Sequence, residues 1–348
     1  MEKLFFSCLI FIGSIVCLNA QDAELLALRN KKRAQLSYNN AVKAIKMKKY
    51  DAALPSLDEA ISLQDDYAAA YLQRGKVYFE LGNAIKANAD FDLALMHDNG
   101  LGEAYFCKGF VFYSIDSLND ALANMNKAIE SGYEEHFVYY YRALIKLRNE
   151  DYNGSIFDFS KAIEKKPDYV LAYHDRATAK SQIKDYQGAI YDYRHAVNYD
   201  GTFVLAFVNM GNVKKKIGDF QGAVTDYTSA IHLQPDYYLA YNNRGNAYYE
   251  MGDYQKAEVD FMKCNELKPD YSMALVNLGN LNNKRGKYEE SISYYNSAIE
   301  LAPDDGQAYL NRGLTYELTG DLESACIDWN MAYKMGVEEA GRYLNECK

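Results

Sequence analysis

The sequence repeats with a period of 34 residues, and this period restricts the possible folds more than any other feature. Small residues recur at this interval: Ala41, Gly75, Gly109, Ala143, Ala177, Gly211, Gly245, Gly279 and Gly313. If these residues are assigned position 8, nine units fill residues 34–339 without an insertion. Units of this size bury their apolar faces by stacking on one another, so we predict a repeat array. The predicted units are 34–67, 68–101, 102–135, 136–169, 170–203, 204–237, 238–271, 272–305 and 306–339.

Small and bulky side chains alternate in a fixed pattern inside each unit. Positions 20 and 27 are small in every unit, as in Ala257 and Cys264. Position 24 is bulky, from Leu57 in the first unit to Trp329 in the last. Small residues allow two helix axes to approach closely, and the bulky ones fill the space beside them. The pattern therefore predicts two antiparallel helices in each unit.

Turn-forming residues also keep a constant place in the repeat. Glycine at position 15 predicts a left-handed residue that ends the first helix, and aspartate at position 16 predicts a cap for the second. Proline at position 32 predicts the end of the second helix. These residues are Gly82, Gly218, Gly252, Gly286 and Gly320, then Asp151, Asp185, Asp219, Asp253 and Asp321, then Pro167, Pro235, Pro269 and Pro303.

Together these residues resemble the tetratricopeptide repeat. The unit 238–271, with the sequence YLAYNNRGNAYYEMGDYQKAEVDFMKCNELKPDY, is similar to that repeat at nearly every signature position, and the similarity extends over residues 34–339. The resemblance implies an all-α fold, a right-handed α-solenoid (superhelix) of helix-turn-helix hairpins. It also implies that the first helix of each unit lines a concave groove used for protein–protein interaction.

Both ends of the chain differ from the repeats. Residues 1–20 contain Lys3 followed by 15 uncharged, mostly apolar residues and end in Ala20, which predicts a secretory signal peptide. One alternative is a membrane anchor, but a span needs about 20 apolar residues. Another is lipidation at Cys17, which would require a smaller residue than Val16 before it. Residues 21–33 are predicted to form a lead-in helix, and residues 340–348 a C-terminal capping helix.

Charge and export restrict the partners. The formal net charge of −10 disfavours binding to a nucleic acid backbone, and the basic residues around Lys31 and Lys32 are interpreted as a solvated helix face. No second long apolar run follows the leader, so we expect no stable transmembrane segment after its cleavage. The expected location is periplasmic, associated with the outer envelope, or secreted.

The cysteines allow one disulfide near the C-terminus. Cys107 and Cys264 lie four units apart, and Cys264 occupies a small-residue position, which favours a buried space-filling role. Cys326 and Cys347 would lie opposite each other if the chain reverses direction near Val337. In an exported protein they are candidates for a disulfide bond that holds the cap, and free thiols remain the alternative.

No catalytic motif is present. The sequence contains no C-x-x-C, H-E-x-x-H or G-x-S-x-G and no phosphate-binding glycine loop. The five histidines fall at scattered positions of the repeat, without the spacing of metal ligands. We therefore expect no catalytic residues, no metal and no cofactor, and an enzyme acting on glycans or peptides is the least favoured hypothesis.

Amide side chains gather at positions 6 and 9 of the C-terminal units, which the resemblance places on the groove. They are Asn209, Asn212, Asn243, Asn246, Asn277, Asn280 and Asn311, with Lys215, Lys216 and Lys284 beside them at positions 12 and 13. An amide can donate to a peptide C=O and accept from a peptide N–H, so these residues are candidates for holding an extended chain. The lysines would favour acidic ligand residues. The alternative is that the asparagines only solvate the inner face.

The third and fourth units offer an aromatic patch instead. Its residues are Phe106, Phe110, Tyr113, Phe137, Tyr140 and Tyr141, some of which must belong to the core. A contiguous apolar patch on a groove is a candidate peptide pocket.

The main functional hypothesis is a protein–protein interaction scaffold or adaptor that binds an extended peptide segment of a partner in its concave groove. The alternative is a structural or assembly component of a cell-envelope complex that self-associates or acts through its convex face. The identity of the partner protein is not encoded in any motif of the sequence.

Overall fold

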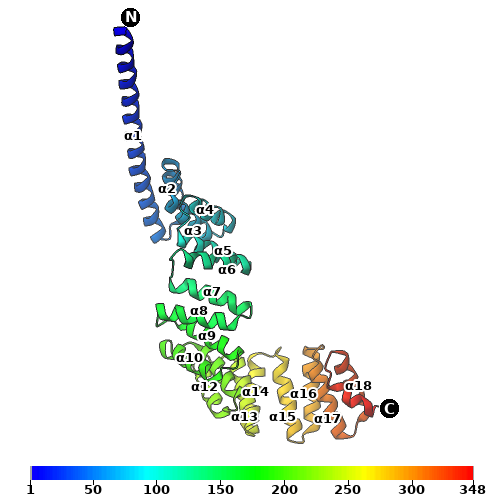
Figure 1. Ribbon diagram of the computed structural model, residues 1–348. Helices are drawn as coiled ribbons and strands as arrows, with labels where there is room; N and C mark the ends of the chain where they lie inside the picture. Colours follow the sequence, from blue (N-terminus) through cyan, green and yellow to red (C-terminus); the bar gives the residue numbers. More distant parts are fainter. Residues whose placement is uncertain (1, 348) are drawn as a thin grey trace. The chain divides into compact units, whose positions relative to one another are not determined.

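The computed structural model describes the backbone of residues 2–347 and the side chains of residues 22–347. Over that range every regular element is a helix and no strand occurs (Figure 1). The chain divides into two compact units, Met1–Pro167 and Asp168–Lys348. We call them unit 1 and unit 2, and from here on we call each 34-residue segment a repeat. The predicted all-α repeat array is therefore confirmed, whereas the handedness of a superhelix over the whole chain stays a prediction.

Both units are built from helix hairpins. Unit 1 contains α1 (Glu2–Lys46), α2 (Tyr50–Leu63), α3 (Ala68–Glu80), α4 (Ala84–His97), α5 (Gly102–Ser114), α6 (Leu118–Glu130), α7 (His136–Arg148) and α8 (Tyr152–Lys165). Unit 2 contains α9 (Val170–Gln182), α10 (Tyr186–Tyr199), α11 (Val204–Lys216), α12 (Phe220–Leu233), α13 (Tyr238–Glu250), α14 (Tyr254–Leu267), α15 (Ser272–Lys284), α16 (Tyr288–Leu301), α17 (Gly306–Thr319), α18 (Leu322–Lys334), α19 (Ala340–Tyr343) and the 3-10 helix η1 (Leu344–Glu346).

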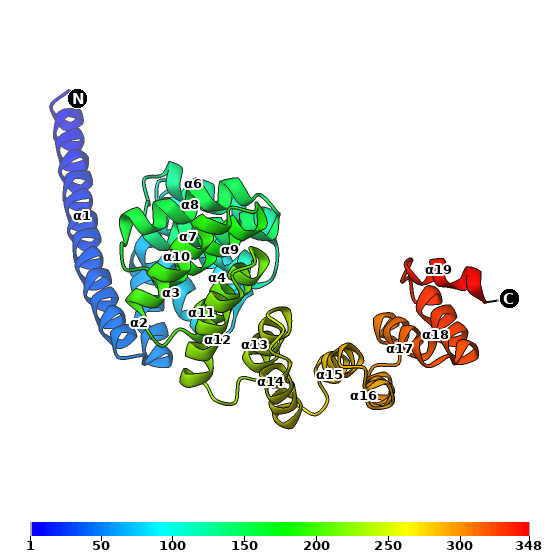
Figure 2. The ribbon, with the colours of Figure 1, turned by 90° about the horizontal axis from the view of Figure 1, so that it is seen from below.

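Helices pack first within a hairpin and then against the next hairpin of the same unit. In unit 2, α13 packs on α14, α14 on α15, and α15 on α16, and the first helices α13, α15 and α17 also contact one another in turn. Figure 2 shows α13 to α18 following one another along this unit. From α3 onward the first helix of each pair begins 34 residues after the previous one. The period of the sequence is thus the period of the hairpins.

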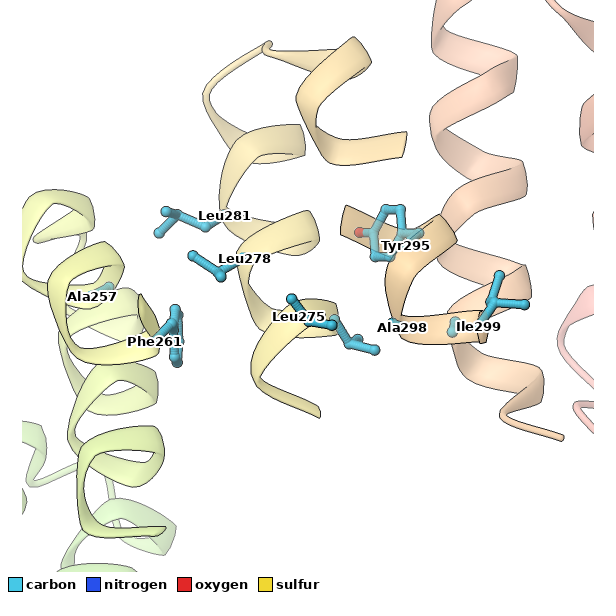
Figure 3. Close-up of a cluster of buried hydrophobic side chains, with 10 residues drawn as sticks. Ala257, Phe261, Leu275, Leu278, Leu281, Tyr295, Ala298 and Ile299 are labelled. Carbon is cyan, nitrogen blue, oxygen red and sulfur yellow. The ribbon is translucent and has the colours of Figure 1, made fainter. Parts of the chain in front are cut away.

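Glycine at position 8 sets how closely the two helices of a hairpin approach. A Cβ atom on Gly245 would lie 2.7 Å from the ring of Phe261, and one on Gly279 would lie 2.6 Å from the ring of Tyr295. Real side-chain contacts are longer, so the bulky residue at position 24 occupies the space that glycine leaves empty. Around Tyr295, residues of α14, α15 and α16 form one continuous core (Figure 3).

Each hairpin turn has a left-handed residue at position 15. Glycine fills this position in five repeats, with φ from 75° to 84°. The other four repeats adopt the same conformation with Lys48, Asp116, Glu150 and Lys184, whose φ values are 55° to 63°. The predicted aspartate caps are confirmed, because the carboxylate at position 16 accepts a hydrogen bond from the backbone N–H three residues later, as Asp219 does from Gly222.

A buried ion pair recurs in five repeats, and the sequence pattern alone did not reveal it. The arginine at position 7 donates two hydrogen bonds of 2.6–2.8 Å to the aspartate at position 23 of the same repeat. The pairs are Arg74–Asp90, Arg142–Asp158, Arg176–Asp192, Arg244–Asp260 and Arg312–Asp328. In each repeat the guanidinium also lies over the tyrosine ring at position 4, 5.4–5.6 Å from its centroid.

The two ends of the array are organised differently. The backbone of α1 runs without a break through the predicted leader and lead-in segment into the first repeat, and the side chains of the leader lie outside the described residues. At the other end, the expected capping helix is short, consisting of α19 followed by η1. Cys326 of α18 and Cys347 form a disulfide bond, with their Cα atoms 5.7 Å apart. Within the part of the chain described, no helix has the length and apolar character needed to span a bilayer.

Candidate functional site

The predicted asparagines lie on the first helices of unit 2, and several bind each other or neighbouring repeats. Asn277 is buried and donates to Asn242 Oδ1 at 2.8 Å. Asn209 Nδ2 lies 3.0 Å from His174 Nε2, and Asn311 donates to Asn280 Oδ1 at 3.0 Å. Each bond joins a position-6 asparagine to the preceding repeat. These amides therefore hold adjacent first helices together.

At position 9 the partner is the residue at position 24 of the same repeat. The hydroxyl of Tyr227 donates to Asn212 Oδ1 at 2.7 Å, and the hydroxyl of Tyr295 donates to Asn280 Oδ1 at 2.6 Å. Burial raises the pKa of both tyrosines, so the phenols stay neutral donors. The position-9 amide is thereby fixed with its Oδ1 atom toward the core.

Repeat 7 breaks this pattern because its neighbours are apolar. Asn209 pairs with His174, at position 5 of the preceding repeat, and the residue at that position before Asn243 is Val208. At position 24, where a tyrosine would supply a hydroxyl to Asn246, repeat 7 has Phe261. Asn243 and Asn246, both half-buried on α13, consequently form no side-chain hydrogen bond with any described residue. Their amides are available to a ligand.

A pocket of about 320 Å³ lies among the first helices of the last three repeats. We call it the amide pocket; its lining residues are Tyr249, Asn280, Asn283, Lys284, Tyr295, Asn311, Leu314 and Leu318. Three of the predicted groove residues line it, namely Asn280, Lys284 and Asn311. Tyr249, Asn283 and Tyr295 were not predicted, although their 34-residue positions, 12 and 24, could have identified them.

Several polar groups of the amide pocket have unused hydrogen-bonding capacity. Among the described residues, Asn280 makes hydrogen bonds only through its Oδ1 atom, so none of them uses its two N–H groups. Asn283 donates to Thr315 Oγ1 at 2.5 Å and leaves its own Oδ1 atom free. Lys284 is exposed and makes no ion pair with a described residue. The pocket thus offers donors, one acceptor and a positive charge, and no carboxylate lines it.

The two other predicted lysines lie outside this pocket. Lys215 is half-buried at the end of α11, and desolvation by burial lowers its pKa, partly offset by Glu250. Lys216 is exposed. Neither residue contributes to the lining of the amide pocket.

The predicted aromatic patch divides into groove and core. Tyr140 is wrongly assigned to the groove, because only 7 % of it is exposed and its ring centroid lies 5.7 Å from that of Phe159 in the core. Phe137 packs on Phe106 at 4.7 Å. Tyr113 packs edge-on against Tyr141 at 5.6 Å, which in turn lies 4.8 Å from Phe110.

Phe106 and Phe110 also line a second pocket, of about 260 Å³, in unit 1. We call it the apolar pocket; its lining residues are Ile45, Tyr50, Gln73, Lys76, Val77, Phe79, Glu80, Phe91, Phe106, Cys107 and Phe110. Burial raises the pKa of the Cys107 thiol to about 12, so its sulfur is a neutral part of the lining.

Among the described side chains, no group of three or more His, Cys, Asp or Glu is placed to hold a metal ion. His174 Nδ1 lies 2.8 Å from Asp175 Oδ1, while its Nε2 atom faces Asn209, which assigns this histidine a role in the contact between repeats.

Comparisons with known proteins agree with this architecture. The TPR repeat profile matches residues 45–82, 211–252 and 279–320, and the tetratricopeptide repeat profile matches residues 238–271. No curated protein matches significantly.

Three solved structures share the fold. The C-terminal part of a TPR repeat-containing protein from Cytophaga hutchinsonii is 20 % identical, with 69 % of this chain and 99 % of that chain covered and a TM-score of 0.57. A tetratricopeptide repeat protein from Parabacteroides merdae is 15 % identical over 71 % and 98 % of the two chains, with a TM-score of 0.52. YrrB, a TPR protein, is 21 % identical over 53 % and 95 %, with a TM-score of 0.50. The profiles therefore show tetratricopeptide repeats at the residues that they match, and the helix pairs and the shared fold show a tandem array of helix hairpins.

Proposed function

We propose that unit 2 binds an extended peptide segment of a partner protein along α13, α15 and α17, and that the protein acts as a scaffold or adaptor. Tetratricopeptide repeats typically mediate protein–protein interaction. The observation that carries the proposal is the set of unused polar groups on these helices: Asn243, Asn246, the amide of Asn280, the carbonyl of Asn283 and the ammonium of Lys284.

These groups suit a peptide backbone. An extended chain presents N–H and C=O groups that must be satisfied when water is displaced, and amide side chains satisfy both kinds. Lys284 favours an acidic residue in the peptide, because the pocket holds no carboxylate to neutralise it. Leu314 and Leu318 supply apolar contact at the same place. The solved relative YrrB is described as having an unusual peptide-binding site, which supports a peptide as the class of ligand.

Site-specific photo-crosslinking in the native cells tests the proposal. Benzoylphenylalanine replaces Leu318 at the amide pocket or, in a matched control, Met262, which is 54 % exposed on the second helix α14. We expect the Leu318 position to capture a polypeptide, whose crosslinked residues are then mapped by mass spectrometry.

The captured segment is then synthesised and titrated against variants. Because the side chains of Asn243 and Asn246 make no hydrogen bond with a described residue, replacing both by alanine should leave the melting temperature unchanged while weakening peptide binding about tenfold or more. Lys284→Glu should weaken the binding of an acidic segment further. The proposal is refuted if the Leu318 position captures nothing, or if the captured segment binds the Asn243→Ala/Asn246→Ala variant as tightly as the parent.

We also propose that the mature protein acts outside the cytoplasm, in the periplasm, on the outer envelope or in the medium. The leader-like pattern of residues 1–20 supports this, as does the Cys326–Cys347 disulfide, since disulfides persist in oxidising compartments. N-terminal sequencing of protein from its native source should begin at Gln21. A sequence that begins at Met1 contradicts the proposal.

A second candidate function is assembly through the second helices of the hairpins. These helices carry exposed apolar residues at one repeat position, with Tyr191 58 %, Val259 66 % and Ile327 60 % exposed. Apolar side chains repeated on one face favour association. Light scattering on the parent and on Val259→Lys/Ile327→Lys tests this idea, and a parent that is monomeric at all concentrations rejects self-assembly.

A further inference from the structure

The apolar pocket and the amide pocket occupy the same place in the repeat. Seven lining residues of the first correspond to seven of the second, and each pair is separated by 204 residues, or six repeats of 34. The pairs are Ile45 and Tyr249, Lys76 and Asn280, Phe79 and Asn283, Glu80 and Lys284, Phe91 and Tyr295, Cys107 and Asn311, and Phe110 and Leu314. The repeat thus forms one kind of pocket twice, and only the side chains differ.

The exchanges change the chemistry of the pocket from polar to apolar. Phe91 replaces Tyr295 and removes the hydroxyl at the floor, while Phe79 and Cys107 replace two asparagines. Phe106 and Phe110 close one wall, their ring centroids 6.1 Å apart. A peptide backbone would find few partners here, whereas an apolar side chain would lose its contact with water.

The charged residues at the edge of the apolar pocket are a second observation, independent of its apolar lining. Lys76 and Glu103 form an ion pair and neutralise each other. Glu80 is exposed, and its single partner among the described side chains is the Tyr50 hydroxyl, 3.4 Å away, so none of these side chains compensates its negative charge. At the equivalent place the amide pocket has the positive charge of Lys284. The two pockets therefore differ in the sign of their free charge as well as in polarity.

We propose that the apolar pocket is a second peptide-anchoring site, which takes one aromatic or branched aliphatic side chain flanked by a basic residue that pairs with Glu80. This inference concerns unit 1 and does not rest on the function proposed for unit 2. The volume of about 260 Å³ agrees with a side chain as the occupant, because pockets for whole small-molecule ligands measure about 300–1,000 Å³.

Methyl NMR of the full chain reports on the two pockets separately. The probes are the peptide Gly-Ser-Arg-Phe-Arg-Ser-Gly, the same peptide with Ala in place of Phe, and the same peptide with Glu in place of both Arg. Methyl groups of Ile45 and Val77 report on the apolar pocket, and those of Leu314 and Leu318 on the amide pocket. We expect the first peptide to shift Ile45 and Val77 alone.

The expected changes in affinity follow from burial and charge. Replacing Phe by Ala should weaken binding about tenfold or more, since a buried phenyl ring contributes most of the apolar contact. Replacing Arg by Glu should weaken it about threefold at low ionic strength, with a smaller effect as salt is added. Glu80→Lys should reverse the order of the Arg and Glu peptides and leave the Phe-to-Ala ratio unchanged.

A pocket-filling variant provides the matched control. Cys107→Tyr places in the pocket a side chain that the next repeat already carries at the same position, as Tyr141, so the hairpin accommodates it. With circular dichroism unchanged, this variant should lose the Ile45 and Val77 shifts. Equal binding of the Phe and Ala peptides, or shifts confined to Leu314 and Leu318, would overturn the proposal. Shifts of Ile45 and Val77 that depend on protein concentration alone would do the same, because a second copy would then be the occupant.

Discussion

Replacement of Arg244 by Met tests the ion pair that recurs in the core of the array. Arg244 donates two hydrogen bonds of 2.8 Å to Asp260, of which only 3 % is exposed. Met is a suitable replacement because repeat 6 carries Met210 at the same position. The variant leaves the Asp260 carboxylate buried without its cation. Removing one partner of such a pair costs about 3–5 kcal/mol of unfolding free energy.

The effect should depend on pH in a defined direction. Desolvation raises the pKa of Asp260 even in the presence of Arg244, which partly opposes the shift, and removing the arginine raises it further. A carboxyl group whose pKa is raised on folding favours the folded state when protonated. Its destabilisation is therefore absent below the unfolded pKa of about 3.9 and grows as pH rises through the folded value. Arg244→Met should thus lower the free energy of unfolding much less at about pH 4 than at about pH 7.

Urea unfolding followed by circular dichroism at both pH values measures the effect. The double variant Arg244→Met/Asp260→Asn removes the buried charge and should recover most of the loss at neutral pH. The parent and the single variant Asp260→Asn complete the cycle. An equal loss at both pH values, or no recovery in the double variant, would refute the reasoning that desolvation of the carboxylate dominates.

Two further predictions concern the turns and the cap. Lys184→Gly should stabilise the protein by about 1 kcal/mol, because Lys184 has a φ of 63° that glycine adopts without strain, and Gly252→Lys should lose a similar amount; urea midpoints measure both. Cys347→Ser should lower stability by about 2–4 kcal/mol, and a reductant should reproduce the loss in the parent but not in the variant; an unchanged midpoint would show that the disulfide does not stabilise the cap.

The candidate site was only partly predictable from sequence. Asparagines at positions 6 and 9 could be placed on the inner helices, but their availability depends on neighbours from other helices. Asn212 is bound by Tyr227, whereas Asn246 is free because Phe261 stands at the equivalent position. Tyr140 is buried for a similar reason, since its ring packs on Phe159. A periodic pattern gives the helix face of a residue, and the partner across the interface decides whether its polar atoms are satisfied.

The sequence by itself determined the helix hairpin, its length and its turns, because these depend on local features: small residues at fixed spacing, a glycine with positive φ and an aspartate cap. The tertiary structure decided what the inner surface offers. Three features arise where side chains from different helices meet. They are the bidentate Arg–Asp pairs, the asparagine hydrogen bonds between repeats, and the two pockets, one polar and one apolar. Those contacts are set by packing between repeats, which a one-dimensional period does not specify.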